Sequence, residues 1–317
     1  MPRSTWTPAR VARMRSAIED APSVSAAAEQ LGISRGTIEG ACQRHLGCSA
    51  ASLLGGPRTL RPLELSSRGH GSELKRILFI PDAHRPYHDK DAYAVMLAAA
   101  RRFKPHTLAI LGDYADFYAV SSHDTDPRRA NMLEQEVADV LCGLDELDAL
   151  PGVERKIYVE GNHEQRLERY LMKKAPALFG TVSVASVLEL ERRGWEYAPY
   201  KEFARVGKLL VTHDLDKYGL NAVRAARADA EANIVIGHVH RMEVLYGGCA
   251  FGSTKVAACF GWLGSRKASS YKHRIRANRE WTHGFGIGYM EPSGTVHLRG
   301  VPIIDGACCL NGELVRA

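Results

Sequence analysis

Aspartate, asparagine and histidine occur in five short motifs whose spacing could assemble a metal site. In chain order these are Asp82-Ala83-His84, Gly112-Asp113-Tyr114-Ala115-Asp116, Gly161-Asn162-His163-Glu164, Thr212-His213 and Gly237-His238-Val239-His240. Oxygen and imidazole ligands without a thiolate suit Mn²⁺, Fe²⁺ or Zn²⁺ better than soft metals. An isolated histidine is more often a core or surface imidazole, so each motif alone is weak evidence. The ordered set is hard to explain in that way and predicts a metal centre.

Each motif follows an apolar run that reads as a short strand buried on both faces. The runs are Ile77–Ile80, Leu108–Leu111, Ile157–Val159, Leu209–Val211 and Ile234–Ile236. Ligands of α/β sheets gather at the carboxyl ends of strands, so the five motifs are expected to meet. Further helices are predicted over residues 90–103, 126–147, 164–174 and 218–230, and Gly-rich strands over 244–258 and 285–289.

In this order, D-x-H, G-D-x-x-D, G-N-H-E, H and G-H-x-H resemble the motifs of the calcineurin-like metallophosphoesterases. The resemblance covers residues 76–302, and the returning segment Trp281–Tyr289 looks most like phosphoesterases encoded in bacteriophages and prophages. It implies an α/β fold, a two-sheet α/β/β/α sandwich.

The resemblance also implies a role for each motif residue. One ion would be held by Asp82, His84, Asp113 and His240, and a second by Asp113, Asn162, His213 and His238. Asp113 would bridge two divalent ions about 3.5–4 Å apart. Mn²⁺ is the first expectation, with Fe²⁺, Zn²⁺ or Ni²⁺ as alternatives. A water between the ions would lose its proton and attack phosphorus in line.

His163 would act as the general acid that protonates the leaving oxygen. Asp116 would accept a hydrogen bond from His163 and raise its pKa.

Two positions depart from the family pattern. Protein phosphatases of this superfamily carry an arginine after the second aspartate, where this chain has Phe117, and the change weakens a phosphoprotein-phosphatase reading. Many relatives have glycine after the histidine of the fourth motif, where this chain has Asp214.

The first 50 residues predict a small all-α domain. Thr7-Pro8 opens one helix, and residues 23–45 read as helix, turn at Gly32, and second helix capped by Ser34. This pattern resembles a helix-turn-helix DNA-binding module, in which Ser34, Arg35 and Thr37 would enter the major groove. A module that binds protein or only decorates the enzyme is the alternative.

Composition predicts where the domains divide and where the chain resides. Residues 1–50 are predicted as the helix-turn-helix domain, 51–75 as a Gly-, Ser-, Pro- and Arg-rich linker, and 76–310 as the phosphoesterase domain. Seven cysteines without a C-x-x-C motif predict reduced thiols. Since neither a membrane span nor a signal peptide is evident, a cytoplasmic protein of a bacterial or phage-infected cell is expected.

Charge is unevenly distributed along the chain. The formal net charge is +6, and residues 264–279 carry six cations and no acid. A basic stripe on a near-neutral body favours a polyanionic partner, although an exposed solvated loop explains it equally well. The candidate contacts to nucleic acid outside the first domain are Arg128, Arg129, Arg166, Arg266, Lys267, Lys272, Arg274 and Arg276.

Together these features predict a two-metal phosphodiesterase that hydrolyses nucleic acid, with DNA favoured, and that is able to form homo-oligomers. One alternative is a phosphomonoesterase or cyclic-nucleotide phosphodiesterase whose helical module binds protein. The other is a DNA-binding regulator on an inactive phosphoesterase body, against which the complete ligand set argues.

Overall fold

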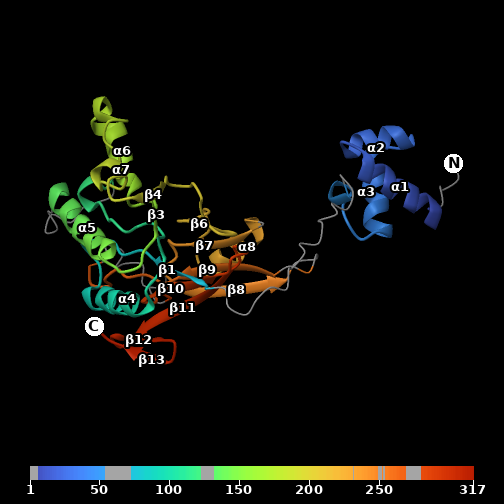
Figure 1. Cartoon of the computed structure of the whole chain (residues 1–317). Coiled ribbons are helices and arrows are strands. Elements are labelled where there is room, and N and C mark those ends of the chain that lie inside the picture. Colours follow the sequence, from blue (N-terminus) through green and yellow to red (C-terminus); the bar gives the residue numbers. More distant parts are fainter. Residues whose placement is uncertain are drawn as a thin grey trace. The chain divides into compact units, whose positions relative to one another are not determined.

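The computed structural model describes residues 6–53, 73–122, 132–230, 232–248, 252, 254–268 and 280–317, without the side chains of residues 51 and 52. Contacts divide the chain into two compact units, Met1–His70 and Gly71–Ala317 (Figure 1). Most of the predicted linker, residues 54–72, lies outside the described residues.

The first unit consists of helices α1 (Pro8–Asp20), α2 (Val24–Leu31) and α3 (Arg35–His45) and a short 3-10 helix (Ala50–Leu53). The helices begin at Thr7, Ser23 and Ser34, whose side-chain oxygens accept backbone N–H groups of the first turn. Gly32 ends α2 in the left-handed conformation, with φ of 64°, as the turn before α3 requires. Buried Met14, Ile18, Val24, Ile38 and Cys42 contribute to one core. The predicted helices are therefore present.

The larger sheet of the second unit has eight strands in the order β13-β12-β11-β10-β1-β2-β3-β4. Strands β1 to β4 run parallel, and β10 pairs antiparallel with β1. The strands are β1 (Lys75–Ile80), β2 (Thr107–Ile110), β3 (Arg155–Val159), β4 (Trp195–Ala198), β10 (Gly284–Met290), β11 (Val296–Ile304), β12 (Ala307–Leu310) and β13 (Glu313–Val315). Because β13 belongs to this sheet, the body extends past residue 310, where the sequence placed its end.

The smaller sheet has five strands in the order β5-β6-β7-β9-β8. They are β5 (Ala204–Val206), β6 (Leu209–Thr212), β7 (Asn233–Ile236), β8 (Met242–Gly248) and β9 (Thr254–Phe260). Alternate side chains of β1 enter different cores: Ile77 and Phe79 pack between the sheets, and Leu78 and Ile80 pack beneath the helices. Burial on both faces explains why the strand reads as a continuous apolar run.

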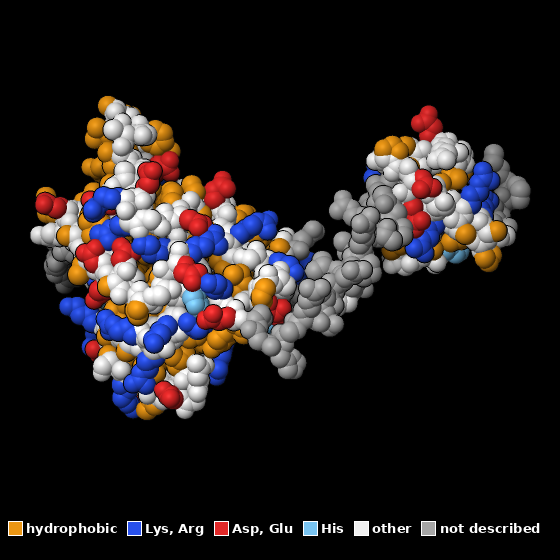
Figure 2. Space-filling view, in the orientation of Figure 1, with side chains coloured by type: hydrophobic (Ala, Val, Ile, Leu, Met, Phe, Trp, Pro, Cys, Tyr) orange, Lys and Arg blue, Asp and Glu red, His pale blue; other side chains and the backbone are white. Residues whose placement is uncertain are grey.

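Helices cover the outer face of each sheet, which completes the predicted α/β/β/α sandwich. Apolar side chains of α4 (Lys90–Phe103), α5 (Leu133–Asp148), α6 (Gln165–Lys174) and α7 (Val184–Val187) share a core with the larger sheet. Helix α8 (Ala222–Asp229) packs on the smaller sheet. Helix α6 projects from the body, and hydrophobic side chains gather at this tip, where Met172, Leu178 and Phe179 are exposed (Figures 1 and 2).

The predicted start of one helix at residues 126–127 lies outside the described residues, within which α5 begins at Leu133 after Met132 in an extended backbone with ψ of 144°. Another helix start differs from the prediction. Helix α8 begins at Ala222 rather than Tyr218, because Gly219 has a positive φ of 73°, which interrupts a helix.

No helix in the described part of the chain is long and apolar enough to cross a membrane. The six described cysteines are free thiols.

Candidate metal centre

The loops after β1, β2, β3, β6 and β7 bring all seven predicted ligands together. The larger sheet supplies Asp82, His84, Asp113 and Asn162, and the smaller sheet supplies His213, His238 and His240. All are buried except Asn162 and His238, which are half-buried. The site therefore lies where the two sheets meet at the carboxyl ends of their strands.

The first group of ligand atoms comes from Asp82, His84, Asp113 and His240. Nε2 of His240 lies 3.3 Å from Oδ1 of Asp82 and 3.2 Å from Nε2 of His84. Nε2 of His84 lies 4.0 Å from Oδ2 of Asp113. Two imidazoles and two carboxylates thus point at one small space.

The second group comes from Asp113, His213 and His238, and Asn162 lies among them. Nε2 of His213 lies 3.3 Å from Oδ2 of Asp113 and 3.1 Å from Oδ1 of Asn162. Nδ1 of His238 lies 2.8 Å from the same oxygen of Asn162. Oδ2 of Asp113 belongs to both groups, while its Oδ1 accepts the backbone N–H of His163 at 2.8 Å.

The donor set fits divalent cations, because lone pairs converge on both groups. Nδ1 of His213 lies 2.8 Å from the carbonyl oxygen of Leu111, which can only accept, so the Nε2 of a neutral ring is left as an acceptor that faces Asp113. Burial alone would lower the pKa of His213, but the Asp113 carboxylate outweighs it and raises the pKa to about 10. The Asp113 carboxylate therefore favours a positive charge at this point, which a metal ion can supply in place of the proton.

Four of the seven predicted ligands have a strained backbone. The φ angles of His84, Asp113, His238 and His240 are 54°, 48°, 66° and 57°, in a region that non-glycine residues rarely adopt. Such conformations cost about 1–3 kcal/mol each and persist where the surrounding structure enforces them, commonly at functional sites.

Glycines allow the ligand loops to approach one another. A Cβ atom on Gly161 would lie 2.2 Å from Oδ1 of Asp113, and one on Gly112 would lie 2.4 Å from Nδ1 of His213. No side chain fits at either position, so both glycines of the motifs serve the packing of the centre.

The predicted general acid His163 lies beside the two groups. Its Nδ1 is 3.1 Å from Oδ2 of Asp116, as the sequence predicted. Its Nε2 is 3.1 Å from Nη2 of Arg166, and since a guanidinium can only donate, this nitrogen accepts. Burial, together with Arg166, lowers the pKa of His163, although Asp113 and Asp116 oppose the shift. Asp116 therefore raises the pKa of His163 as expected, but burial and Arg166 outweigh this contribution.

Asp116 has a second partner that sequence reasoning missed. Its Oδ2 also lies 3.2 Å from Nδ1 of His84, while Arg166 donates to its Oδ1 at 2.8 Å. Burial would raise the pKa of Asp116, but the two histidines and the arginine hold it well below its usual range. One carboxylate therefore orients both a predicted metal ligand and the predicted acid.

Glu164 is a further residue whose role the motif did not reveal. Its side chain is fully buried and accepts the backbone N–H groups of Asp113, Ala115 and Gly161 at 2.9–3.0 Å and the hydroxyl of Tyr158 at 2.8 Å. It therefore holds the loop that carries Asp113 in place.

Replacing Glu164 with Gln is expected to lower the free energy of unfolding by about 2–4 kcal/mol, since an amide NH₂ would face buried N–H donors. Urea unfolding of the metal-free protein measures the change. The control is Glu168→Gln on the exposed face of α6, expected to stay within about 0.5 kcal/mol of the parent. Equal stability of the two variants would contradict the role of Glu164.

Aromatic rings form one wall of the centre. Trp262 stacks on His240 with ring centroids 5.0 Å apart, and Trp281 meets the same imidazole edge-on at 4.5 Å. The exposed ring of Tyr218 lies 5.2 Å from the ring of His238. These contacts restrict the orientation of both imidazoles.

The structure explains both departures from the family pattern. Asp214 is buried and accepts hydrogen bonds from Tyr200 and Lys201, so it anchors the loop beside His213. Phe117 is fully buried in the core under the helices. Arg166, on α6, donates a hydrogen bond to Asp116, so a cation lies beside this carboxylate although position 117 has no arginine.

Only one of the candidate nucleic-acid contacts, Arg166, is shown to lie at the metal centre. Arg166 lies at the centre, and Arg266 donates to the carbonyl of Trp281 while Lys267 is exposed beside it. In the first unit, Ser34 caps α3, its Oγ lies 2.8 Å from Oγ1 of Thr37, and Arg35 pairs with Glu39. Arg128, Arg129, Lys272, Arg274 and Arg276 lie outside the described residues.

Comparison with known proteins agrees with this geometry. Residues 75–260 match the family model of the calcineurin-like phosphoesterases. Gene 54 protein of Mycobacterium phage L5 is 23% identical over 76% of this chain and 98% of its own length. Gene 54 protein of Mycobacterium phage D29 is 25% identical over the same shares.

Solved structures show weaker likeness. A Vps29 single mutant from Entamoeba histolytica has a TM-score of 0.40 at 14% identity, covering 73% of this chain and 94% of its own. The nuclease MPE of Pseudomonas putida has a TM-score of 0.30 at 12% identity, covering 70% and 87%. Similarity at this level leaves the substrate open. The family match and the clustered ligands together show that the chain belongs to the calcineurin-like phosphoesterases and is a metal-dependent phosphoesterase.

Proposed function

We propose that the chain is a two-metal phosphodiesterase that hydrolyses DNA, with Mn²⁺ as the preferred ion. The observation that carries the proposal is that two groups of ligand atoms share Oδ2 of Asp113. A shared carboxylate oxygen suits two ions at the short separation that two-metal hydrolases use. The ions would supply positive charge to the phosphoryl oxygens and lower the pKa of an attacking water.

The residues beside the centre would move the proton. His163 is held between Asp116 and Arg166, which donates to its Nε2. A substrate phosphate that attracts Arg166 would release this nitrogen and remove the cation that opposes protonation. His163 would then carry a proton, stabilised by Asp116, and deliver it to the leaving oxygen.

The choice of DNA rests on the two units of one chain. The first unit has the helices of the predicted helix-turn-helix, with Arg35 and Arg44 exposed on α3. Such a module would hold the enzyme on duplex DNA and raise the local substrate concentration. The phage proteins that the chain resembles favour action in the cytoplasm of a phage-infected bacterium.

Hydrolysis of four substrates tests the proposal: labelled single- and double-stranded DNA, bis-p-nitrophenyl phosphate and p-nitrophenyl phosphate, each with Mn²⁺ and with EDTA. Metal-dependent cleavage of DNA that is absent from Asp113→Asn protein is expected. Cleavage of the small esters alone would point to a nucleotide or phosphomonoester substrate. Binding of DNA without any hydrolysis would point to a regulator.

The role of the first unit in holding the enzyme on duplex DNA is tested by the double variant Arg35→Ala/Arg44→Ala in the full chain. Losing two phosphate contacts is expected to reduce the slope of log affinity against log salt for duplex DNA by about 1.8. Fluorescence anisotropy in EDTA measures it, with Arg13→Ala/Arg15→Ala on α1 as the matched control. A slope equal to the parent's would assign the module to protein binding instead.

A further inference from the structure

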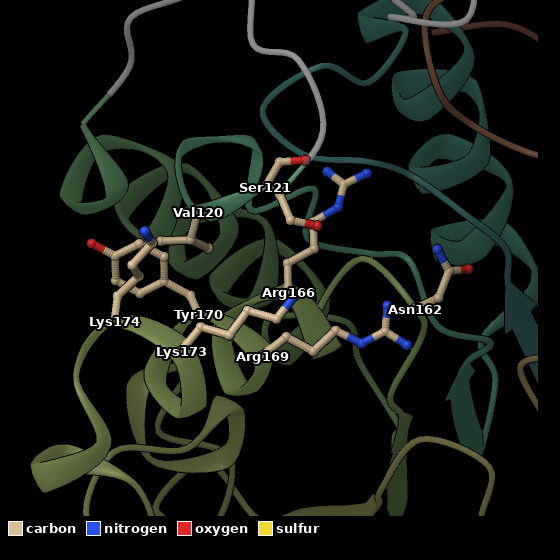
Figure 3. Close-up of a pocket in the computed structure, with 9 residues that line it drawn as sticks. Val120, Ser121, Asn162, Arg166, Arg169, Tyr170, Lys173 and Lys174 are labelled. Atoms are coloured by element: carbon tan, nitrogen blue, oxygen red, sulfur yellow. The ribbon is translucent and has the colours of Figure 1, made fainter.

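A pocket opens beside the metal centre along one side of helix α6. Its lining includes Ser121, Asn162, Arg166 and Tyr170, and its volume is about 160 Å³. Asn162, a predicted ligand, lies at one end, and Tyr170 lies at the other (Figure 3). The pocket thus extends from the predicted metal ligands along helix α6.

The lining is strongly cationic. Arg166, Arg169, Lys173 and Lys174 contribute four positive charges, and none of the nine lining residues is acidic. Leu167 and Leu171 are buried in the core on the opposite side of α6. The three- and four-residue spacing sets Arg166, Arg169 and Lys173 in one row, and Lys174 follows at the end of the helix. Concentrated charge of one sign in a concave site attracts an anion.

The cations differ in whether a side chain of the protein already binds them. The side chain of Arg166 is 11% exposed and is bonded to Asp116 and His163. Within the described residues, Arg169 and Lys173 have no carboxylate partner, although they are exposed. Their charges are available to a ligand, whereas Arg166 connects the row to the predicted general acid.

The small volume and the length of the pocket suit a segment of an extended ligand better than a whole small molecule. A volume of about 160 Å³ is below the roughly 300–1,000 Å³ of pockets that enclose a whole small molecule. From residue 166 to residue 174 the helix rises about 12 Å. A strand within duplex DNA spaces its phosphates about 3.4 Å along the axis, so this length spans at most roughly three phosphates of one strand.

We infer that this pocket, hereafter the α6 groove, binds the single-stranded DNA backbone that flanks the scissile phosphate. This inference rests on the proposed function and names the substrate form. Arg166 receives the phosphate nearest the predicted metal ligands, and Arg169, Lys173 and Lys174 together contact the phosphates beyond it. The ring of Tyr170, 42% exposed, offers a face on which a base can stack.

The test compares three full-length variants with the parent. Arg169→Ala/Lys173→Ala removes two charges from the groove, and Arg169→Lys/Lys173→Arg keeps them. Lys90→Ala/Arg101→Ala removes one Lys and one Arg from exposed positions on α4. The N-terminal unit is the same in all of them, so its contribution to DNA binding cancels.

Affinity for a fluorescent single-stranded oligonucleotide is measured by anisotropy in EDTA at several salt concentrations. The groove variant is expected to bind about tenfold more weakly at 0.1 M salt, with a salt slope lower by about 1.4 for two lost contacts to a single strand. The charge-preserving variant and the α4 variant should bind like the parent. Tyr170→Ala is expected to weaken binding about five- to tenfold with the slope unchanged, because stacking is not ionic.

Hydrolysis of bis-p-nitrophenyl phosphate, too short to span the groove, should stay at the parental rate in every variant. If the parent cleaves DNA and the groove variant binds and cleaves it equally well, the groove has no such role while the proposed function stands. A parent that hydrolyses only small esters would overturn both. Equal losses on single strands and on blunt duplex would overturn the single-strand assignment.

Discussion

Asp113→Asn is expected to abolish metal-dependent hydrolysis, lowering kcat by at least about a thousandfold, since several kcal/mol of charge stabilisation are lost. Oδ2 of Asp113 belongs to both groups of ligand atoms, so an amide there weakens both at once. The rate with bis-p-nitrophenyl phosphate and Mn²⁺ measures the loss.

A second readout for Asp113→Asn does not depend on activity. Mn²⁺ at about 100 times its dissociation constant should stabilise the parent by about 2.7 kcal/mol and the variant by far less. The control is Asp145→Asn, since this carboxylate is exposed on α5, pairs with Arg193 and belongs to neither group of ligand atoms. A variant that keeps both the parental rate and the parental stabilisation would remove Asp113 from the centre.

His163→Ala is expected to lower kcat on DNA by about 10²- to 10⁴-fold, the usual contribution of a positioned general acid. The metals should still bind, because His163 contacts Asp116 and Arg166 and belongs to neither predicted ligand set. Titration with Mn²⁺ followed by thermal unfolding checks this, and unchanged stabilisation is expected.

The leaving group separates proton donation from a structural role. A p-nitrophenolate departs readily without a proton, whereas the sugar oxygen of DNA requires one. The loss for His163→Ala should therefore be much smaller with bis-p-nitrophenyl phosphate than with DNA. His297→Ala on β11, which pairs with Glu291 on the surface, is the matched control. Equal losses on both substrates would show that His163 only positions its neighbours.

The sequence predicted the centre well because its ligands follow short apolar strands. Parallel strands such as β1, β2 and β3 bring their carboxyl ends to one edge, so motifs such as Asp82-Ala83-His84 converge once the strand order is known. Both apolar faces of β1 could be read from its continuous hydrophobicity. The layers of the sandwich followed from the resemblance to the calcineurin-like phosphoesterases, not from this pattern.

Other features were beyond the sequence because they depend on contacts between distant segments. Arg166 follows His163 by three residues, yet its partner Asp116 is 50 residues away. The lowered pKa of His163 arises from Arg166 and from burial, which outweigh the rise from Asp116 that the motif suggested. The stacking of Trp262 on His240 likewise joins strands that only the fold brings together.

Because the ligands come from both sheets, metal binding is coupled to the docking of the sheets during folding. Asp82 comes from the larger sheet and His240 from the smaller one, and they are separated by 158 positions in the chain. A cation held by both joins the two layers as a cross-link does, and its binding energy adds to their docking. Because contacts this distant in sequence form slowly, the ability to capture a metal ion should be among the last properties a refolding chain regains.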